Sequence, residues 1–217
     1  MGTTDPGESV ESAALLARAA EGDLGAWGAL LMQHEARLCR MVGFRLDSRL
    51  RGRVDAADVV QEAYLEAADH RADYFRQPPL PLFLWLRGIV GNKLLEVHRH
   101  HLATRMREAG REVAHFPASP DATSVALMDQ LSGNATGPRT AAVRAELKGK
   151  LHDALASMDP IDREALALRH FEQLTNREAA VVLGIEERAA AKRYVRALKR
   201  LREVLTGIPG GLTEMRT

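Results

Sequence analysis

The sequence contains a single cysteine, Cys39, and few aromatic residues, which make up 5% of its 217 residues. One cysteine cannot form an intramolecular disulfide or a cysteine-ligated zinc site, so a reducing, cytoplasmic compartment is expected. The chain also has no run of about eighteen apolar residues of the kind that spans a membrane. Its first residues contain acids and no apolar stretch typical of a signal peptide. We therefore expect no membrane insertion.

The chain has almost no net charge, because 30 Lys and Arg balance 29 Asp and Glu to give +1. This balance argues against a uniformly cationic protein that binds any polyanion, but it leaves room for a local basic surface. With 46% hydrophobic and 27% charged residues the composition is that of a globular protein, and the length allows one large or two small domains.

Ala, Leu, Arg and Glu dominate the sequence, which favours helices over strands. Apolar periodicity predicts helices over residues 9–21, with Ser9 as N-cap, and over 26–43, 55–69 and 81–102. In the third of these, Val59, Ala63 and Tyr64 are expected to face inward. Three prolines between residues 77 and 81 predict a break before the fourth helix.

The composition changes after residue 102. Residues 103–141 contain several Pro, Ser and Gly positions and predict a long flexible linker. A second helical block follows over 142–206, and residues 207–217 are expected to form a flexible tail. The expected fold class is all-α, with two small helical domains at 22–102 and 142–206 and an N-terminal extension at 1–21. No alternation of strands and helices typical of an α/β enzyme is present.

The second block contains a pattern typical of a helix-turn-helix. Thr175 and Glu178 have the spacing of a capping box, Gly184 is placed to turn the chain, and a second helix is expected to start near Glu186 or Glu187. From there to residue 202 every charged side chain after the initial glutamates is a cation: Arg188, Lys192, Arg193, Arg196, Lys199, Arg200 and Arg202. Such a helix suits a phosphate backbone, although a solvated basic surface without a partner is the plainer alternative.

Docking geometry separates these residues into two roles. The first residues of a recognition helix meet base edges, and later residues meet phosphates. The predicted base readers are Glu186, Glu187, Arg188, Ala189 and Lys192. The predicted phosphate contacts are Arg193, Arg196 and Lys199.

Four segments resemble one known family. The run DAADVVQEAY at 55–64 resembles the DAEDVVQEVF signature of region 2 of bacterial sigma factors, and LFLWLRGIVGNK at 82–93 resembles the FxxWLxxIARN segment that follows it. Residues 155–169 resemble the start of region 4, and 174–201 resemble its helix-turn-helix. The order of these segments, with a linker and no intervening domain, is similar to that of the extracytoplasmic-function (group 4) sigma factors.

The resemblance implies a non-catalytic subunit that binds core RNA polymerase through its clamp helices and flap, recognises promoter DNA and helps to melt it. It implies no cofactor and no metal, a free monomer, and an anti-sigma factor as a further partner. The implied polymerase-binding residues are Asp55, Asp58, Val59, Gln61 and Glu62. The implied contacts to the minus-ten element are Tyr74, Phe75, Asn92, Lys93, Glu96, His98 and Arg99. Thr175 joins the helix-turn-helix residues as a contact to the minus-thirty-five element.

Three other interpretations remain open at this stage, and one of them is a degenerate sigma paralogue that acts only as a binding partner. A stand-alone helix-turn-helix regulator would bind duplex DNA without polymerase, as a dimer on two half-sites. An enzyme with a metal site at His98 to His101 would need a carboxylate partner and a recognisable catalytic constellation, which the sequence does not offer. Ala191 also stands where many sigma factors have a lysine, so the base preference of the recognition helix is open.

Overall fold

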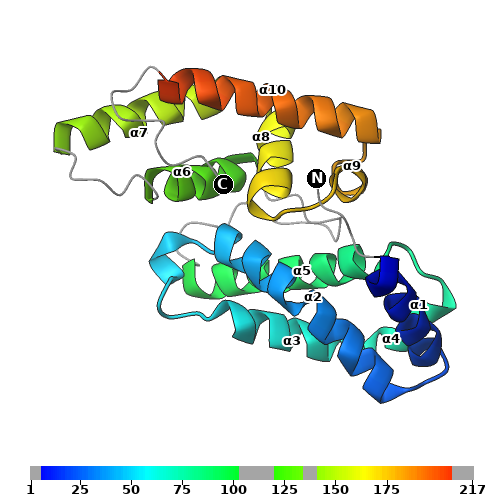
Figure 1. Ribbon diagram of the computed structural model, residues 1–217. Helices are drawn as coiled ribbons and strands as arrows, with labels where there is room; N and C mark the ends of the chain where they lie inside the picture. The colour runs from blue at the N-terminus through cyan, green and yellow to red at the C-terminus, as the bar shows by residue number, and fades with distance from the viewer. Residues whose placement is uncertain (1–5, 103–119, 134–140, 207–217) are drawn as a thin grey trace. The chain divides into compact units, whose positions relative to one another are not determined.

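The computed structural model describes residues 6–102, 120–133 and 141–206, and every regular element in these ranges is helical apart from one isolated β-bridge in the turn at 51–54 (Figure 1). The all-α prediction is therefore confirmed for these ranges. The chain divides into two compact units. Unit 1 contains residues 1–42 and 52–106, and unit 2 contains 43–51 and 107–217.

Unit 1 is built from α1 (Pro6–Ala20), α2 (Leu24–Arg45, up to Val42), α3 (Ala56–Asp69), α4 (Arg71–Arg76) and α5 (Leu82–Leu102). These helices match the four predicted ones, with the short α4 as an addition that the sequence did not predict. The predicted N-cap Ser9 is wrong, because α1 already begins at Pro6. Asp55 caps α3, since its Oδ1 accepts from the Ala57 N–H at 2.9 Å.

The core of unit 1 lies between α2, α3 and α5, and α3 packs directly against α5 (Figure 1). Apolar side chains at helical spacing fill it, because burial of their surface is the main stabilising contribution available to a bundle. Its fully buried residues include Leu30, Leu38, Met41, Leu86 and Leu94. The Tyr64 hydroxyl donates to the Leu31 carbonyl at 2.6 Å and fastens α3 to α2.

The turn between α1 and α2 is held by Asp23. Its Oδ1 accepts from the Ala26 N–H at 2.9 Å, and its Oδ2 accepts from Arg18 at 2.6 Å. The backbone hydrogen bond from Ala26, followed by the one from Arg18, lowers the pKa of Asp23. The carboxylate therefore stays ionised at the positive end of α2, where the helix dipole favours it.

Unit 2 contains η1 (Ser48–Leu50), α6 (Pro120–Gly133), α7 (Ala141–Ala156), α8 (Pro160–Leu166), a π-helical turn η2 (Ala167–Phe171), α9 (Asn176–Leu183) and α10 (Glu187–Thr206). Helix α8 packs against α6, α9 and α10, and α7 packs against α6 and α10 (Figure 1). The shared core includes Leu127, Leu151, Leu155, Leu166 and Leu201.

Helix α6 falls inside the segment predicted as a linker, residues 103–141. It is more than a connector, since Leu127 is completely buried and Ala126 nearly so, within the core of unit 2. Residues 103–119 and 134–140, which carried the rest of that prediction, lie outside the described residues, as does the predicted tail 207–217.

Segment 43–51 also belongs to unit 2, and a buried ion cluster anchors it there. Arg45 donates to Glu172 and to Glu164, each at 2.5 Å, and Thr123 of α6 donates to Glu164 at 2.6 Å. Burial disfavours the charged form of Arg45, but the attraction of the two glutamates is stronger and raises the pKa of Arg45. Phe44 stacks on Phe171 beside this cluster, with ring centroids 4.9 Å apart.

Candidate nucleic-acid interface

The helix-turn-helix predicted from the sequence is present in unit 2. The Thr175 hydroxyl accepts from the Glu178 N–H at 3.1 Å, and Glu178 accepts from the Thr175 N–H at 2.8 Å, so the capping box is complete. Gly184 ends α9 in the left-handed conformation, with φ of 63°. Glycine adopts this backbone conformation at little cost, which lets the chain turn sharply into α10.

Helix α10 separates an inner face from an outer one. Ala190, Ala197 and Leu201 are almost completely buried and contact the rest of unit 2. The small side chains allow α10 to approach α8 and α9 closely. The opposite face is exposed at Arg188, Lys192 and Lys199.

The structure places most of the predicted base readers at the surface. Glu186, Glu187, Arg188 and Lys192 are exposed, whereas Ala189 is half-buried. Thr175 is also exposed, but its hydroxyl and N–H both serve the capping box. The main role of Thr175 in this structure is therefore to cap α9.

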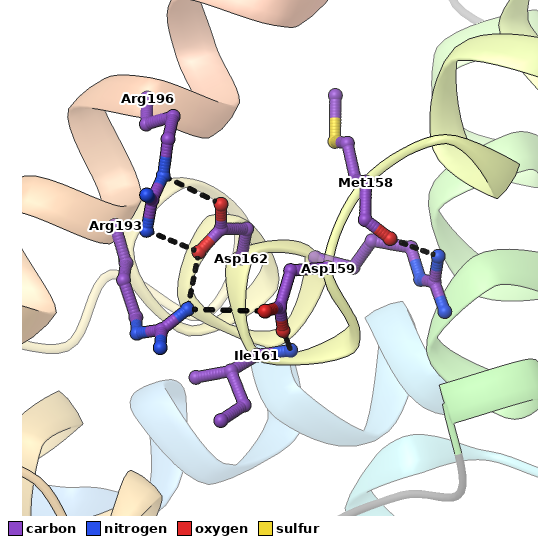
Figure 2. A network of polar contacts seen from close by, with 7 residues as sticks. Met158, Asp159, Ile161, Asp162, Arg193 and Arg196 are labelled. Atoms are coloured by element: carbon purple, nitrogen blue, oxygen red, sulfur yellow. Dashed lines mark hydrogen bonds and ion pairs between the residues drawn. The ribbon is translucent and has the colours of Figure 1, made fainter.

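Two of the three predicted phosphate contacts, Arg193 and Arg196, pair with acids at the start of α8, which are Asp162 and the N-cap residue Asp159. Asp162 accepts from Arg193 at 2.8 Å and from the Nε of Arg196 at 2.8 Å, and a second contact joins Arg196 Nη2 to Asp162 Oδ1 at 3.1 Å. The Oδ2 of Asp159 lies 3.6 Å from Nη1 of Arg193. Figure 2 shows both arginines reaching from α10 towards these carboxylates. The hydrogen bond that Arg193 donates to Asp162 raises the pKa of Arg193.

These four side chains differ in exposure, and the difference separates their roles. The side chain of Asp162 is 7% exposed, that of Arg193 is 25% exposed, and that of Arg196 is 64% exposed. Asp162 thus lies beneath the arginines, whereas the side chains of Arg196 and of Asp159, which is 51% exposed, reach solvent. No sequence pattern predicted this pairing, because Asp162 precedes the arginines by 31 and 34 positions.

The same corner of unit 2 joins α7 to α8. Asp159 caps α8 by accepting from the Ile161 N–H at 2.9 Å. Arg163 donates to the Leu155 carbonyl at 2.6 Å and to the Met158 carbonyl at 2.8 Å. The carbonyls at the end of α7 thereby gain donors that the helix itself does not supply.

In unit 1 an acidic surface lies along α3. Asp58, Gln61 and Glu62 are exposed, and with Tyr64 and Leu65 they line a surface depression. Leu65 is 72% exposed, a large apolar side chain that the sequence prediction of this site omitted. Val59 is 2% exposed. The prediction of Val59 as a polymerase contact is therefore corrected to a core role, because its side chain points under this surface.

The aromatic residues predicted for base stacking differ from each other. Tyr74 is 6% exposed and its hydroxyl donates to the Leu80 carbonyl at 3.2 Å, so its ring is part of the core. This corrects its prediction as a stacking group. Phe75 is half-buried and meets Tyr74 and Trp27 edge-on, with centroid distances of 5.2 and 5.9 Å. The ring centroid of Trp85 lies 4.6 Å from that of Tyr74, and Trp85 completes the aromatic cluster.

The remaining minus-ten candidates lie between the middle and the end of α5. Asn92, Glu96 and Arg99 are exposed, and His98 is half-buried. Lys93 donates to Glu96 at 2.9 Å and lies 4.0 Å from Glu62 of α3. The hydrogen bond with Glu96 raises the pKa of Lys93. Lys93 is therefore a fixed cation between the two predicted surfaces of unit 1.

Within residues 6–102, 120–133 and 141–206, no three His, Cys, Asp or Glu side chains lie together as a metal site would require. The same ranges hold no helix that is both long and apolar enough to span a membrane.

Comparisons with known proteins point to one family over most of the chain. The sigma-70 region 4 family profile matches residues 148–201. The chain is 31% identical over 204 residues to RNA polymerase sigma factor NccH of Alcaligenes xylosoxydans, covering 93% of this chain and 97% of that protein. It is 28% identical over 190 residues to the ECF RNA polymerase sigma factor SigD of Mycobacterium tuberculosis, covering 88% of this chain and 82% of that protein.

A solved structure shows the same fold. The structure of CnrH in complex with the cytosolic domain of CnrY superposes with a TM-score of 0.51 at 24% identity, over 92% of this chain and 99% of that chain. CnrH of Cupriavidus metallidurans is itself 29% identical to this chain over 88% of its length and 92% of that protein. The chain thus belongs to the extracytoplasmic-function sigma factors, the non-catalytic subunits that direct RNA polymerase to promoters.

Proposed function

We propose that the two units divide this sigma function, with α10 of unit 2 binding the minus-thirty-five element and unit 1 binding polymerase and the minus-ten element. The exposed cationic face of α10 carries the proposal. Arg188, Lys192 and Lys199 project from a helix that follows a capped helix and a glycine turn. This arrangement suits a recognition helix whose first turn enters the major groove.

Charge and chemistry support a base-reading role for the first turn of α10. An arginine or lysine donates to guanine, and a glutamate accepts from the amino group of cytosine. Arg188, Lys192 and the glutamates at 186 and 187 offer both kinds of contact. Because Ala191 is half-buried in the lysine position of many relatives, we propose that Lys192 supplies the main donor instead.

For polymerase we propose the exposed surface of α3, formed by Asp58, Gln61, Glu62 and Leu65, as the contact to the clamp helices. An apolar side chain surrounded by acids and an amide fits the anatomy of a protein interface, in which an apolar centre is ringed by polar groups. Asp55 contributes by capping α3 and so fixes the start of this helix. Unit 2 would contact the flap.

For the minus-ten element we propose that Phe75, supported by the aromatic cluster beneath it, stacks on an extruded base. Extruding a base costs a few kcal/mol, and stacking on an aromatic ring returns about 1–3 kcal/mol. Asn92, Glu96, Arg99 and His98 on the end of α5 would contact the same DNA, with Lys93 as a positioned cation.

We further propose that the chain acts in the cytoplasm, as a monomer when free, without cofactor or metal, and that an anti-sigma factor restrains it. CnrH, to which this chain is similar, has been solved in complex with the cytosolic domain of CnrY. A partner of that kind would cover the same surfaces that polymerase and DNA need.

Run-off transcription with core RNA polymerase and a genomic fragment library tests the division of roles. The wild-type chain should produce discrete new start sites that share two spaced elements. Asp58→Ala should weaken co-elution with core enzyme, whereas Lys192→Ala should keep co-elution and lose transcripts that depend on the minus-thirty-five element. Asp153→Asn, at an exposed position of α7, is the matched control. Tight binding of a dimer to duplex DNA, with no transcript in the presence of core enzyme, would contradict the proposal.

A further inference from the structure

The contact between α8 and α10 contains a carboxylate that no proposed DNA or polymerase contact uses. Asp162 is buried, yet it carries a charge and faces two arginines of the recognition helix (Figure 2). A buried carboxylate is costly unless it is paired and hydrogen-bonded, and here the two arginines satisfy it. The pairing therefore restricts the side-chain positions of both arginines as well as that of Asp162.

The two arginines use Asp162 differently. Arg193 is mostly buried and also lies beside Asp159, so it sits between two acids of α8. Arg196 approaches side-on, with Nε 2.8 Å from Oδ2 and Nη2 3.1 Å from Oδ1. A guanidinium has five N–H donors in one plane, and this side-on pairing engages only the Nε edge.

This pairing leaves the terminal edge of Arg196, between Nη1 and Nη2, without a contact to Asp162 through Nη1. Its two Nη1 donors and the second Nη2 donor lie on the side chain that is 64% exposed. A planar fork held on one edge by a carboxylate presents its other edge in a fixed direction, which is the geometry that a phosphate oxygen pair needs.

We propose that Asp162 is a positioning residue for DNA binding, which holds the guanidinium of Arg196 so that its free edge meets a phosphate of the minus-thirty-five element. The proposal rests on the assignment of α10 as the recognition helix. It assigns Arg193, by contrast, to fastening Asp162 and α8, although the sequence predicted both arginines as phosphate contacts. Asp162 itself does not touch DNA.

The test is a double-mutant cycle between Asp162→Asn and Arg196→Ala in the holoenzyme, read as affinity for a promoter duplex with an intact or a scrambled minus-thirty-five element. Asparagine keeps the shape of aspartate but cannot hold two cations. Each single variant should weaken binding to the intact element by up to about thirty-fold, the equivalent of the rotamer entropy of one arginine side chain. The double variant should be no weaker than Arg196→Ala alone.

Three results would overturn the proposal. The first is that the effects of the two substitutions on the dissociation constant multiply in the double variant. The second is that Asp162→Asn leaves DNA binding unchanged while Arg196→Ala weakens it. The third is that Asp162→Asn tightens binding through Arg196, which would make Asp162 a restraint on that arginine. Thermal melts of each variant and the exposed control Asp153→Asn separate loss of fold from loss of contact.

Arg196→Lys keeps the test decisive even where Asp162→Asn unfolds unit 2. A lysine can pair with Asp162 but has no second edge, so it should behave like Arg196→Ala, and full activity of Arg196→Lys would overturn the proposal. Lys192→Ala distinguishes this inference from the function on which it rests. If neither Lys192→Ala nor Arg196→Ala changes discrimination between the two duplexes, then the recognition-helix assignment itself has failed.

Discussion

Arg163 provides a direct test of how unit 2 is held together. Helix α7 ends at Ala156, and the carbonyls of its last turn have no partners within the helix. The backbone carbonyl of Asp153 accepts from the Ser157 N–H at 3.0 Å, and the backbone carbonyl of Ala154 accepts from the Ser157 hydroxyl at 2.8 Å. Arg163, 8% exposed, supplies the donor for the Met158 carbonyl and a second donor for Leu155.

We expect Arg163→Met to destabilise unit 2 by about 2–4 kcal/mol. Methionine fills a similar volume but removes two charge-assisted hydrogen bonds, each of which contributes about 1.5–3 kcal/mol. Part of this loss is offset in two ways. Leu155 still accepts from the Met158 N–H at 3.2 Å, and the variant no longer buries a charge. The stability of Arg163→Lys should lie between those of the wild type and Arg163→Met, since a single ammonium group replaces the planar guanidinium.

Urea denaturation followed by circular dichroism and by tryptophan fluorescence measures this effect unit by unit. The only two tryptophans, Trp27 and Trp85, lie in unit 1, so fluorescence reports on that unit while circular dichroism reports on both. Separate transitions of two units are expected in such a chain. The exposed Arg177→Met on α9 is the matched control and should change stability by less than about 0.5 kcal/mol. A loss below about 1 kcal/mol in Arg163→Met would refute the carbonyl-capping argument.

Three further predictions concern the helix cap, the turn and the aromatic cluster. Thr175→Ala should cost about 1 kcal/mol in urea denaturation because α9 loses its capping box, and Thr175→Ser should restore most of it. Gly184→Ala should also cost about 1 kcal/mol, because an added Cβ meets no atom within 4 Å and only the positive φ opposes it; a neutral result would contradict the left-handed turn. In permanganate footprinting of the open promoter, Phe75→Ala should reduce melting, whereas Tyr74→Phe, which loses only the hydrogen bond to Leu80, should leave melting intact. Equal losses in both variants would argue against Phe75 as the stacking group.

Local signals explain what the sequence predicted well. The capping box at Thr175 and the glycine turn at Gly184 depend on residues within a few positions of one another, and both are present. The breaks and starts of α2, α3 and α5 follow from proline positions and apolar periodicity in the same way. Helix α4, with only six residues, is too short to show a period and was missed.

Burial inside a recognised motif was harder to predict. Val59 and Asp58 are neighbours in the segment that resembles region 2, but one is core and the other surface. Helical periodicity already placed Val59 inward, and the motif resemblance added it to the contact surface. Tyr74 shows the same difficulty, because an aromatic residue beside a proline loop suits a core position and a stacking position equally well until Trp27 and Trp85 are placed around it.

Pairing across distant segments explains why α10 carries less available positive charge than its sequence suggests. Arg193 and Arg196 face Asp162, and Arg200 lies 3.9 Å from Glu203. A cation that is already paired adds less to DNA binding by counterion release than one that is solvated. The exposed Arg188, Lys192 and Lys199, together with the exposed edge of Arg196, then carry most of the electrostatic attraction, which is modest for a free protein of net charge +1. On the proposed assignment, in which polymerase binds unit 1 through α3, DNA binding by α10 is intramolecular and needs little affinity of its own. The division of charge within α10 therefore fits a subunit that selects promoters as part of the holoenzyme.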